Sequence, residues 1–239
     1  MESAVTFESV NYIIDGLHIL RDISGSFYKG KITTLVGPSG AGKTTLLKLC
    51  NGLLSPNSGR IMIEGHEINE YAPVDLRRLV GMTLQSAPMI GGTVFDNLSL
   101  PLDLRGKKLK VEEARVLLDE VGLEEKLLER NVKELSGGQR QKVSIARTLV
   151  NRPKILLLDE ITSSLDVKSQ KDIEELIVRI NEKYSTTIIW ITHNLEQALG
   201  VGTYSWVMMA GEVIEAGKSD LLLSPADERV KRFVRGEQQ

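Results

Sequence analysis

The most restrictive segment of the chain is GPSGAGKTT at residues 37–45, which directly follows the apolar run at 32–36. It fits the pattern G-x-x-x-x-G-K-[ST], and a helix-like stretch follows it at residues 45–49. A strand, a glycine-rich loop and a helix in this order predict a phosphate-binding loop, because glycines let backbone N–H groups approach phosphate oxygens. Taken alone, the segment could also be a glycine-rich turn before a helix that binds no ligand.

Eight residues of this loop are expected to contact a nucleotide. The ammonium group of Lys43 would neutralise the β- and γ-phosphates, and the hydroxyl of Thr44 would bind Mg²⁺. The expected contacts are Gly37, Ser39, Gly40, Ala41, Gly42, Lys43, Thr44 and Thr45.

A second apolar run, at residues 155–158, ends in the two carboxylates Asp159 and Glu160. In hydrolases with a phosphate loop, an aspartate at this place holds Mg²⁺ beside the loop hydroxyl. The acid that follows can orient or polarise a water for in-line attack on the γ-phosphate. A buried strand that ends at a solvated acidic turn would explain the same residues without catalysis.

The pentapeptide LSGGQ at residues 135–139 has the composition of a helix start. Ser136 is a favoured N-cap, the two glycines permit close backbone approach, and a helix-like stretch follows. The segment predicts a second phosphate-binding helix end, although a serine-capped helix after a glycine hinge would look the same. The sequence leaves open whether Ser136 reaches the nucleotide held by Lys43 or one on another subunit.

Composition restricts the partners and the compartment. The 239 residues include 30 Lys and Arg against 32 Asp and Glu, and aromatic residues make up only 5%, so we expect no nucleic-acid partner. The single cysteine, Cys50, excludes an internal disulfide, suits a reducing compartment and is expected to pack in the core. We find neither a signal peptide nor an apolar run of about 18 residues, which predicts a cytosolic chain.

The order of the elements predicts an α/β fold with a mostly parallel sheet. β-like runs fill residues 4–36, helical spacing dominates from 93 to about 150 (111–121, 123–128 and 139–149), and strands then alternate with helices. We expect one domain over 1–239, with an N-terminal antiparallel β subdomain and the phosphate-loop core at 1–88, an inserted helical subdomain at 89–150 and the rest of the α/β core at 151–239. Ligands of such sheets bind at the carboxyl ends of the strands.

With these motifs, the chain resembles the ATP-binding (nucleotide-binding) subunits of ABC transporters over essentially its whole length. The motifs stand in the family's order: Tyr12, GPSGAGKTT, Gln85, LSGGQ, ILLLDE, SSLD at 163–166, and His193. This ordered set is far more specific than the phosphate loop alone. The resemblance implies a P-loop NTPase core that hydrolyses ATP with Mg²⁺ as cofactor.

The resemblance also implies roles that residue spacing does not explain. Tyr12 would stack on the adenine, where a plain β-strand tyrosine is the alternative. Gln85 would contact Mg²⁺ and the attacking water from a mobile loop that meets the membrane partner. Glu160 would be the catalytic base and His193 would contact the γ-phosphate. The implied catalytic residues are therefore Glu160, His193 and Gln85, and the implied metal ligands are Thr44, Gln85 and Asp159.

The family's behaviour implies a head-to-tail homodimer, formed when ATP is bound, with two ATP molecules at its interface. The residues that would contact the partner's nucleotide in trans are Ser136, Gly137, Gly138, Gln139 and Asp166. A separate integral membrane subunit would carry the solute, which places this chain at the cytoplasmic face of the cell membrane. ATP-driven closure of the dimer would energise the transport.

Three positions depart from the family's usual residues: Ile161 replaces proline, Thr44 replaces the frequent serine, and Asn194 replaces aspartate after the histidine. None removes a group that the chemistry needs. Ile161, together with TVFDNL at 93–98, resembles a bacterial subgroup linked to metal-ion export (the Fet type, with plant aluminium-tolerance relatives). We therefore expect export of iron or another metal ion, with import of phosphate or another solute as the alternative.

Two rival functions are disfavoured. Soluble ABC-type ATPases that act on ribosomes usually carry two cassettes, those of DNA repair carry long coiled coils, and this chain shows one uninterrupted cassette. A nucleotide-binding scaffold without turnover would not need Glu160, Gln85 and His193 together. About 46 residues follow His193, which leaves room for two strands and a short helix, so we expect no appended regulatory domain.

Overall fold

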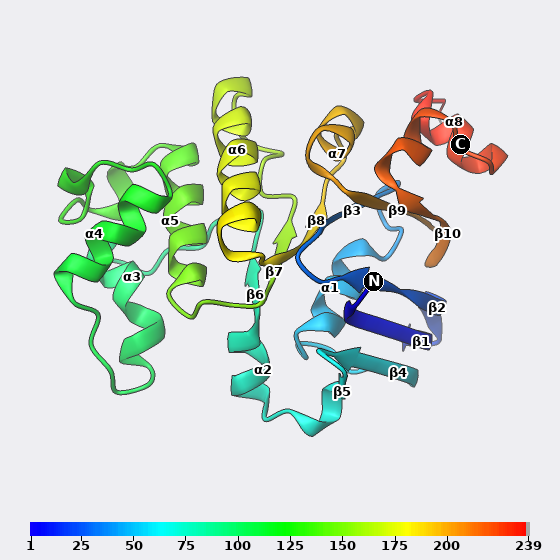
Figure 1. Cartoon of the computed structure of the whole chain (residues 1–239), viewed down its shortest axis with the longest axis horizontal. Helices are drawn as coiled ribbons and strands as arrows, with labels where there is room; N and C mark the ends of the chain where they lie inside the picture. The colour runs from blue at the N-terminus through cyan, green and yellow to red at the C-terminus, as the bar shows by residue number, and fades with distance from the viewer. Residues whose placement is uncertain (238–239) are drawn as a thin grey trace.

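The computed structural model describes residues 1–237 and contains two β-sheets flanked by helices (Figure 1). The smaller sheet is antiparallel and has the strand order β2-β1-β4-β5. Its strands are β1 (Ser3–Ile14), β2 (Leu17–Tyr28), β4 (Ser58–Ile63) and β5 (His66–Glu67). β1 and β2 form a hairpin because Asp15 and Gly16 both adopt positive φ, at 49° and 78°, as a tight two-residue turn requires.

The larger sheet has the order β10-β9-β3-β8-β7-β6, in which all neighbouring strands are parallel except β10, which is antiparallel to β9. Its strands are β3 (Ile32–Val36), β6 (Val80–Thr83), β7 (Ile155–Asp159), β8 (Thr187–Ile191), β9 (Tyr204–Met209) and β10 (Glu212–Lys218). Every residue of β3 and β8 is buried, because helices or the smaller sheet cover both faces of these central strands.

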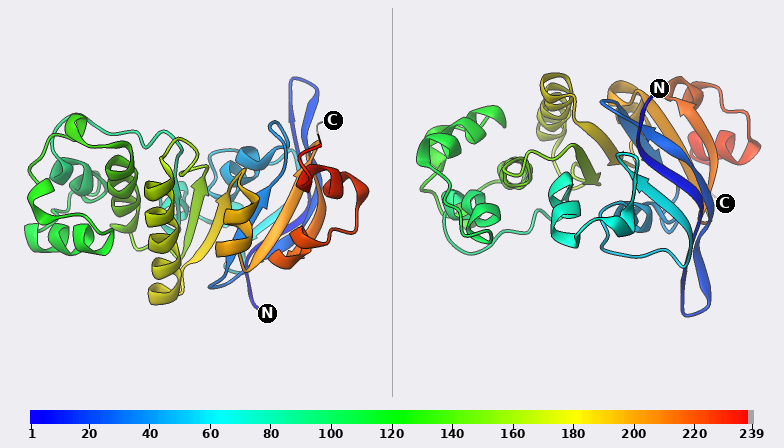
Figure 2. Two further views of the ribbon diagram at one scale, coloured as in Figure 1. Left: turned by 90° about the horizontal axis from the view of Figure 1, so that it is seen from above. Right: turned by 60° about the horizontal axis from the view of Figure 1, so that its bottom comes forward.

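Eight α-helices surround the sheets in the described part of the chain. They are α1 (Lys43–Cys50), α2 (Pro73–Leu79), α3 (Val94–Asp103), α4 (Val111–Glu120), α5 (Gly137–Leu149), α6 (Val167–Tyr184), α7 (Leu195–Val201) and α8 (Glu228–Val234). α3, α4 and α5 lie together at one end of the molecule, beyond α6, in each of the views (Figures 1 and 2). The expected α/β fold with a β subdomain and a helical insertion is confirmed.

The helical prediction for residues 123–128 is wrong in part. Only a short 3₁₀ helix forms there, at Glu125–Leu127. Gly122 adopts φ 65° and the N–H of Leu123 bonds to the carbonyl of Leu118, which ends α4 in a left-handed cap. Leu127 and Leu128 are buried all the same, so their apolar spacing reflects packing in the core rather than a continuing helix.

The two main cores lie on opposite faces of the larger sheet. Along β7, Leu156 and Leu158 belong to the core shared with α3–α6, whereas Ile155 and Leu157 belong to the core shared with the smaller sheet and α1. This alternation follows from the two-residue period of a strand. Cys50 is fully buried in the second core, as expected.

No helix within residues 1–237 is long and apolar enough to cross a membrane.

Candidate nucleotide site

The segments expected to carry the chemistry leave the larger sheet at one edge. Strand pairing sets Leu35 of β3 and Asp159 of β7 opposite Ile191 of β8, and Thr83 of β6 opposite Leu158 of β7. Because these strands are parallel, their carboxyl ends share an edge. The phosphate loop, Glu160, His193 and Gln85 all follow those ends.

The phosphate loop depends on glycine at two positions. Gly37 adopts φ 144°, and a Cβ atom there would lie 2.0 Å from the carbonyl oxygen of Met208. Gly42 adopts φ 94°, and a Cβ atom there would lie 2.6 Å from Cδ2 of Leu20. The loop thus packs against β9 and β2, with Ser39 and Gly40 exposed at its tip and Ala41 buried. No side chain caps the start of α1, which leaves its first N–H groups available to an anion.

Lys43 is buried beneath the phosphate loop. Its Nζ donates hydrogen bonds of 2.8 Å to the carbonyl oxygens of Gly37 and Pro38. Burial lowers the pKa of the ammonium group, and the carboxylates of Glu160 and Asp159 partly offset this effect. An anion bound in the loop would therefore stabilise the charged form of Lys43.

Thr44 and Asp159 face each other across the loop, with Oγ1 of the threonine donating to Oδ1 of the aspartate at 3.0 Å. Burial raises the pKa of Asp159, although the hydrogen bond from Thr44 lowers it. Residues 1–237 contain no cluster of three or more His, Cys, Asp or Glu side chains that could hold a metal. The pair nevertheless fits Mg²⁺, which commonly takes one or two protein oxygens and completes its shell with phosphate and water.

Glu160 and His193 are directly paired, with Oε1 of the glutamate 2.6 Å from Nε2 of the histidine. Glu160 adopts φ 50°, a left-handed conformation that costs a residue with a Cβ atom about 1–2 kcal/mol. This conformation turns the chain sharply after β7. Both side chains keep contact with solvent, at 21% and 40% exposure, so a water molecule can reach the carboxylate.

Gln85 is linked to the same turn through Ser163, which was not among the expected site residues. Its Nε2 donates to Oγ of Ser163 at 2.8 Å, and that hydroxyl donates to the carbonyl oxygen of Glu160 at 2.9 Å. The only sequence signal for Ser163 is its place in SSLD. The loop after β6 is also held by Arg147 of α5, which donates to the carbonyl of Pro88 at 2.7 Å.

Tyr12 lies beside the phosphate loop rather than in it. It is half-buried on β1 and stands opposite Leu20 of β2, the residue against which Gly42 packs. This position is compatible with a ring at the edge of a nucleotide site, and equally with a strand tyrosine that packs on the core.

LSGGQ forms the capped start of α5. Oγ of Ser136 accepts from the N–H of Gln139 at 3.2 Å, and Oε1 of Gln139 accepts from the N–H of Ser136 at 3.0 Å. Gly137 and Gly138 follow this cap, and a Cβ atom on Gly138 would lie 2.9 Å from Oγ of Ser169. The small residues thus let the start of α5 pack against the start of α6.

Asp166 caps α6 close to that contact. Its carboxylate accepts from the N–H of Ser169 at 3.0 Å and from its hydroxyl at 2.7 Å, and both bonds lower the pKa of Asp166. α5 lies apart from α1 in each view (Figures 1 and 2), and no hydrogen bond within residues 1–237 joins 136–139 to 37–45. Within one chain, LSGGQ and the phosphate loop are not brought together.

The unusual residues at two positions fit their surroundings. Ile161 is 1% exposed and packs in the core beside α6, where its apolar side chain is accommodated. Asn194 caps α7, because its Oδ1 accepts from the N–H of Gln197 at 3.1 Å. An aspartate would make the same cap, so the substitution leaves the local structure intact.

Comparison with known proteins gives concordant results. Residues 20–163 match the family described as "ABC transporter". The chain is 44% identical over 238 residues to the Bacillus subtilis (strain 168) protein YjkB, which is named among ABC transporter ATP-binding proteins, covering 98% of this chain and 94% of that one. It is 40% identical over 225 residues to a methionine import ATP-binding protein, MetN, of Cupriavidus metallidurans, covering 91% of this chain and 65% of that protein.

Two solved structures share the fold. CbiO1 of Clostridium perfringens, described as part of the ABC transporter complex cbiONQ, superposes with a TM-score of 0.85 at 30% identity, covering 98% of this chain and 96% of that one. A dimeric ATP-binding cassette, MJ0796 bound to ADP and Pi, superposes with a TM-score of 0.79 at 30% identity, covering 90% of this chain and 98% of that one.

Proposed function

Because the chain belongs to the ABC transporter family, we propose that it is the ATPase subunit that energises passage of a small solute through a separate membrane-spanning partner. One observation carries the proposal: Lys43, the Thr44–Asp159 pair and the Glu160–His193 pair meet at a single edge of the parallel sheet. That edge offers a cradle for phosphates, oxygen ligands for a cation and a carboxylate beside an imidazole.

Backbone N–H groups and one positive charge would bind the phosphates of ATP. The loop at 37–42 and the uncapped start of α1 supply N–H groups, and Lys43 supplies a buried positive charge. Thr44, Asp159 and Gln85 would hold Mg²⁺, which when bound neutralises charge that develops on the phosphates. Tyr12 would stack on the adenine from β1.

Glu160 would act as the base for water attack. Its carboxylate accepts a proton from the water while the water oxygen bonds to the γ-phosphorus and the bond to the ADP oxygen breaks. His193 would keep the carboxylate in position through its 2.6 Å contact and hydrogen-bond the γ-phosphate. Gln85 would orient the water. No covalent bond to the protein is needed, since positioning and electrostatic stabilisation carry most of the catalysis.

The second half of the site would come from another copy of the chain. The start of α5 (Ser136, Gly137, Gly138, Gln139) and Asp166 would contact the nucleotide held by the partner's phosphate loop. The separation of α5 from α1 within one chain and the dimeric arrangement of MJ0796 support this proposal. ATP would then favour the closed dimer by linkage, and hydrolysis would reopen it.

The names of the similar proteins change the substrate and the direction of transport that we propose. Export of metal ions finds no support in these names, whereas the similar proteins include a methionine import ATPase. The chain spans 65% of that protein's length, and 59% of the Rhodopseudomonas palustris MetN 1. We propose import of a small solute, driven from the cytoplasmic face of a membrane through the partner subunit.

Co-purification tests the coupling directly. The tagged chain is isolated from gently solubilised native membranes, and its companions are identified by mass spectrometry, with a Gln85→Ala variant as a probe of the partner-facing loop. A stoichiometric multi-span protein that is depleted from the variant would support the proposal. Ribosomal or DNA-associated proteins without a membrane protein would point instead to a soluble ATPase.

A further inference from the structure

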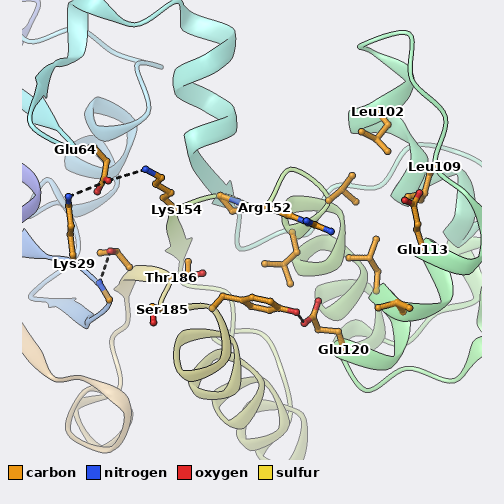
Figure 3. A pocket seen from close by; sticks show the side chains of 18 residues that line it. Lys29, Glu64, Leu102, Leu109, Glu113, Glu120, Arg152, Lys154, Ser185 and Thr186 are labelled. Carbon is orange, nitrogen blue, oxygen red and sulfur yellow. Dashed lines mark hydrogen bonds and ion pairs between the residues drawn. The ribbon is translucent and has the colours of Figure 1, made fainter.

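A cavity of about 780 Å³ opens at the edge of the larger sheet opposite the candidate nucleotide site (Figure 3). One wall is formed by the segments that precede the strands: Lys29 and Gly30 before β3, Pro153 and Lys154 before β7, and residues 185–187 at the start of β8. The other wall is formed by α4 and the carboxyl-terminal ends of α3 and α5. A cavity of this size falls in the range of small-molecule pockets, about 300–1,000 Å³.

Most side chains of the helical wall are apolar. It is lined by Leu102, Leu109, Val116, Leu117, Leu149 and Val150. Val116 remains 64% exposed, so an apolar group seated against this wall would remove hydrocarbon from water. The cavity therefore favours a ligand with an apolar body.

The carboxylates that line the cavity already have partners. Glu64 lies 3.4 Å from the ammonium groups of both Lys29 and Lys154. Glu120 lies 3.0 Å from Nζ of Lys183 and also accepts from the hydroxyl of Tyr184. The third carboxylate belongs to Glu113 and accepts from the N–H of Lys110 at the start of α4, at 3.0 Å. Two of the three carboxylates are therefore paired with ammonium groups, and the third is held by a backbone N–H.

Arg152 is the lining charge without a partner. Among residues 1–237, its guanidinium takes part in no ion pair and no side-chain hydrogen bond. Its side chain extends from the sheet edge toward the helical wall (Figure 3). Arg152 also adopts φ 48°, three residues after the end of α5, a left-handed conformation that residues with a Cβ atom seldom adopt.

We propose that this cavity binds an amphipathic organic anion, with its anionic group at Arg152 and its apolar body against Val116, Leu117 and Leu149. The guanidinium offers the paired N–H donors that carboxylates match. Small hydrophilic anions such as free phosphate gain nothing from the apolar wall. The site is separate from the nucleotide edge and does not depend on the proposed transport function.

The test is calorimetric titration of the whole purified chain with octanoate and with octylammonium, which share a tail and differ in charge. Saturating ADP is present throughout, so that the phosphate loop is already filled. Arg152→Ala removes the proposed contact with the anionic group, and Val116→Asp removes a contact with the apolar body; both positions are exposed. Arg152→Lys keeps the charge, and Arg235→Ala, at the residue that follows α8, is the control. Circular dichroism confirms that each variant is folded.

We expect saturable binding of octanoate, with octylammonium and the Arg152→Ala variant each at least about tenfold weaker, the effect of losing one charge-assisted contact. Val116→Asp should lower the affinity for octanoate by a similar factor, and Arg152→Lys should lower it less. Arg235→Ala should leave this affinity unchanged. Absence of saturable octanoate binding, equal affinity for the two probes, or unchanged octanoate affinity in Arg152→Ala would each overturn the proposal.

Discussion

Nε2 of His193 lies 2.6 Å from Oε1 of Glu160, and the two residues follow neighbouring parallel strands. The register that sets Asp159 opposite Ile191 fixes this contact, because each residue comes one or two positions after its strand. The imidazole therefore orients the carboxylate from a different strand. A change at either position should affect chemistry more than it affects binding.

Replacing Glu160 with glutamine tests the proposed base. We expect the variant to bind MgATP with little change, because the amide keeps the shape and a hydrogen bond to His193. Phosphate release should fall by about 10²–10⁴-fold, the usual worth of a general base. A malachite-green assay of turnover checks the rate, and light scattering checks whether the variant accumulates as an ATP-bound dimer. A monomer at high protein and MgATP concentrations would contradict the proposed sandwich.

Replacing Lys43 with alanine tests the phosphate cradle. Nζ of Lys43 is buried against two carbonyl oxygens, and removing it leaves the bound phosphates without their nearest positive charge. We expect ATP affinity to fall at least about tenfold, in line with one charge-assisted hydrogen bond. Calorimetric titration gives the affinity, and Lys31→Ala, at an exposed position before β3, serves as the control. Normal affinity in Lys43→Ala would refute the assignment of the loop.

The motifs predicted which residues gather at one edge of the larger sheet, because the carboxyl ends of neighbouring parallel strands lie at the same edge. Gly37, Glu160, His193 and Gln85 each follow an apolar run that the sequence marks clearly. Their contacts could not be predicted in the same way. The bond from Gln85 to Ser163 joins segments 78 positions apart, and it depends on the left-handed turn at Glu160.

The lining of the cavity could not be predicted from local sequence patterns either. Arg152 has no motif around it, and its neighbours come from α3, α4 and the ends of α5 and α6. Apolar spacing in residues 123–128 misled the helix prediction because tertiary burial, rather than a helical face, places those leucines. Local patterns therefore predicted elements and edges, while contacts between distant segments required the three-dimensional arrangement.

Replacing Ser136 with arginine tests the proposed contact in trans. Within residues 1–237, the start of α5 shares no hydrogen bond with the phosphate loop, so a bulky cation at Ser136 should not disturb ATP binding by a monomer. It should block close approach of α5 to a partner's nucleotide, and we expect turnover to be lost. Titration of the dilute variant with ATP and a turnover assay at high concentration separate the two effects. Equal loss of binding in the monomer would argue that Ser136 acts within its own chain.

Replacing Asp159 with asparagine tests the electrostatic cost of a carboxylate at the proposed metal-binding position. Burial and the neighbouring Glu160 raise the pKa of Asp159 above its ordinary value of 3.8, despite the hydrogen bond from Thr44. A raised pKa in the folded chain means that protonation favours folding. The contribution of this protonation to the free energy of unfolding is fully present below the ordinary pKa of the carboxyl group. It is lost as the pH rises through the pKa of the folded chain. At pH 7 the ionised carboxylate therefore destabilises the chain when no nucleotide is bound.

Asparagine is neutral and still accepts the Thr44 hydrogen bond, so we expect Asp159→Asn to unfold at a higher temperature than the parent at pH 7 without ligand. The difference should shrink as the pH is lowered toward the ordinary pKa of the carboxyl group, and Asp119→Asn, on the exposed face of α4, should show no such trend. With MgATP the order should reverse, because the parent gains stability from a ligand that the variant binds weakly. Thermal unfolding followed by circular dichroism at several pH values measures both effects. A lower unfolding temperature for the ligand-free variant at pH 7 would show that Asp159 is stabilised by its surroundings rather than held there for a cation.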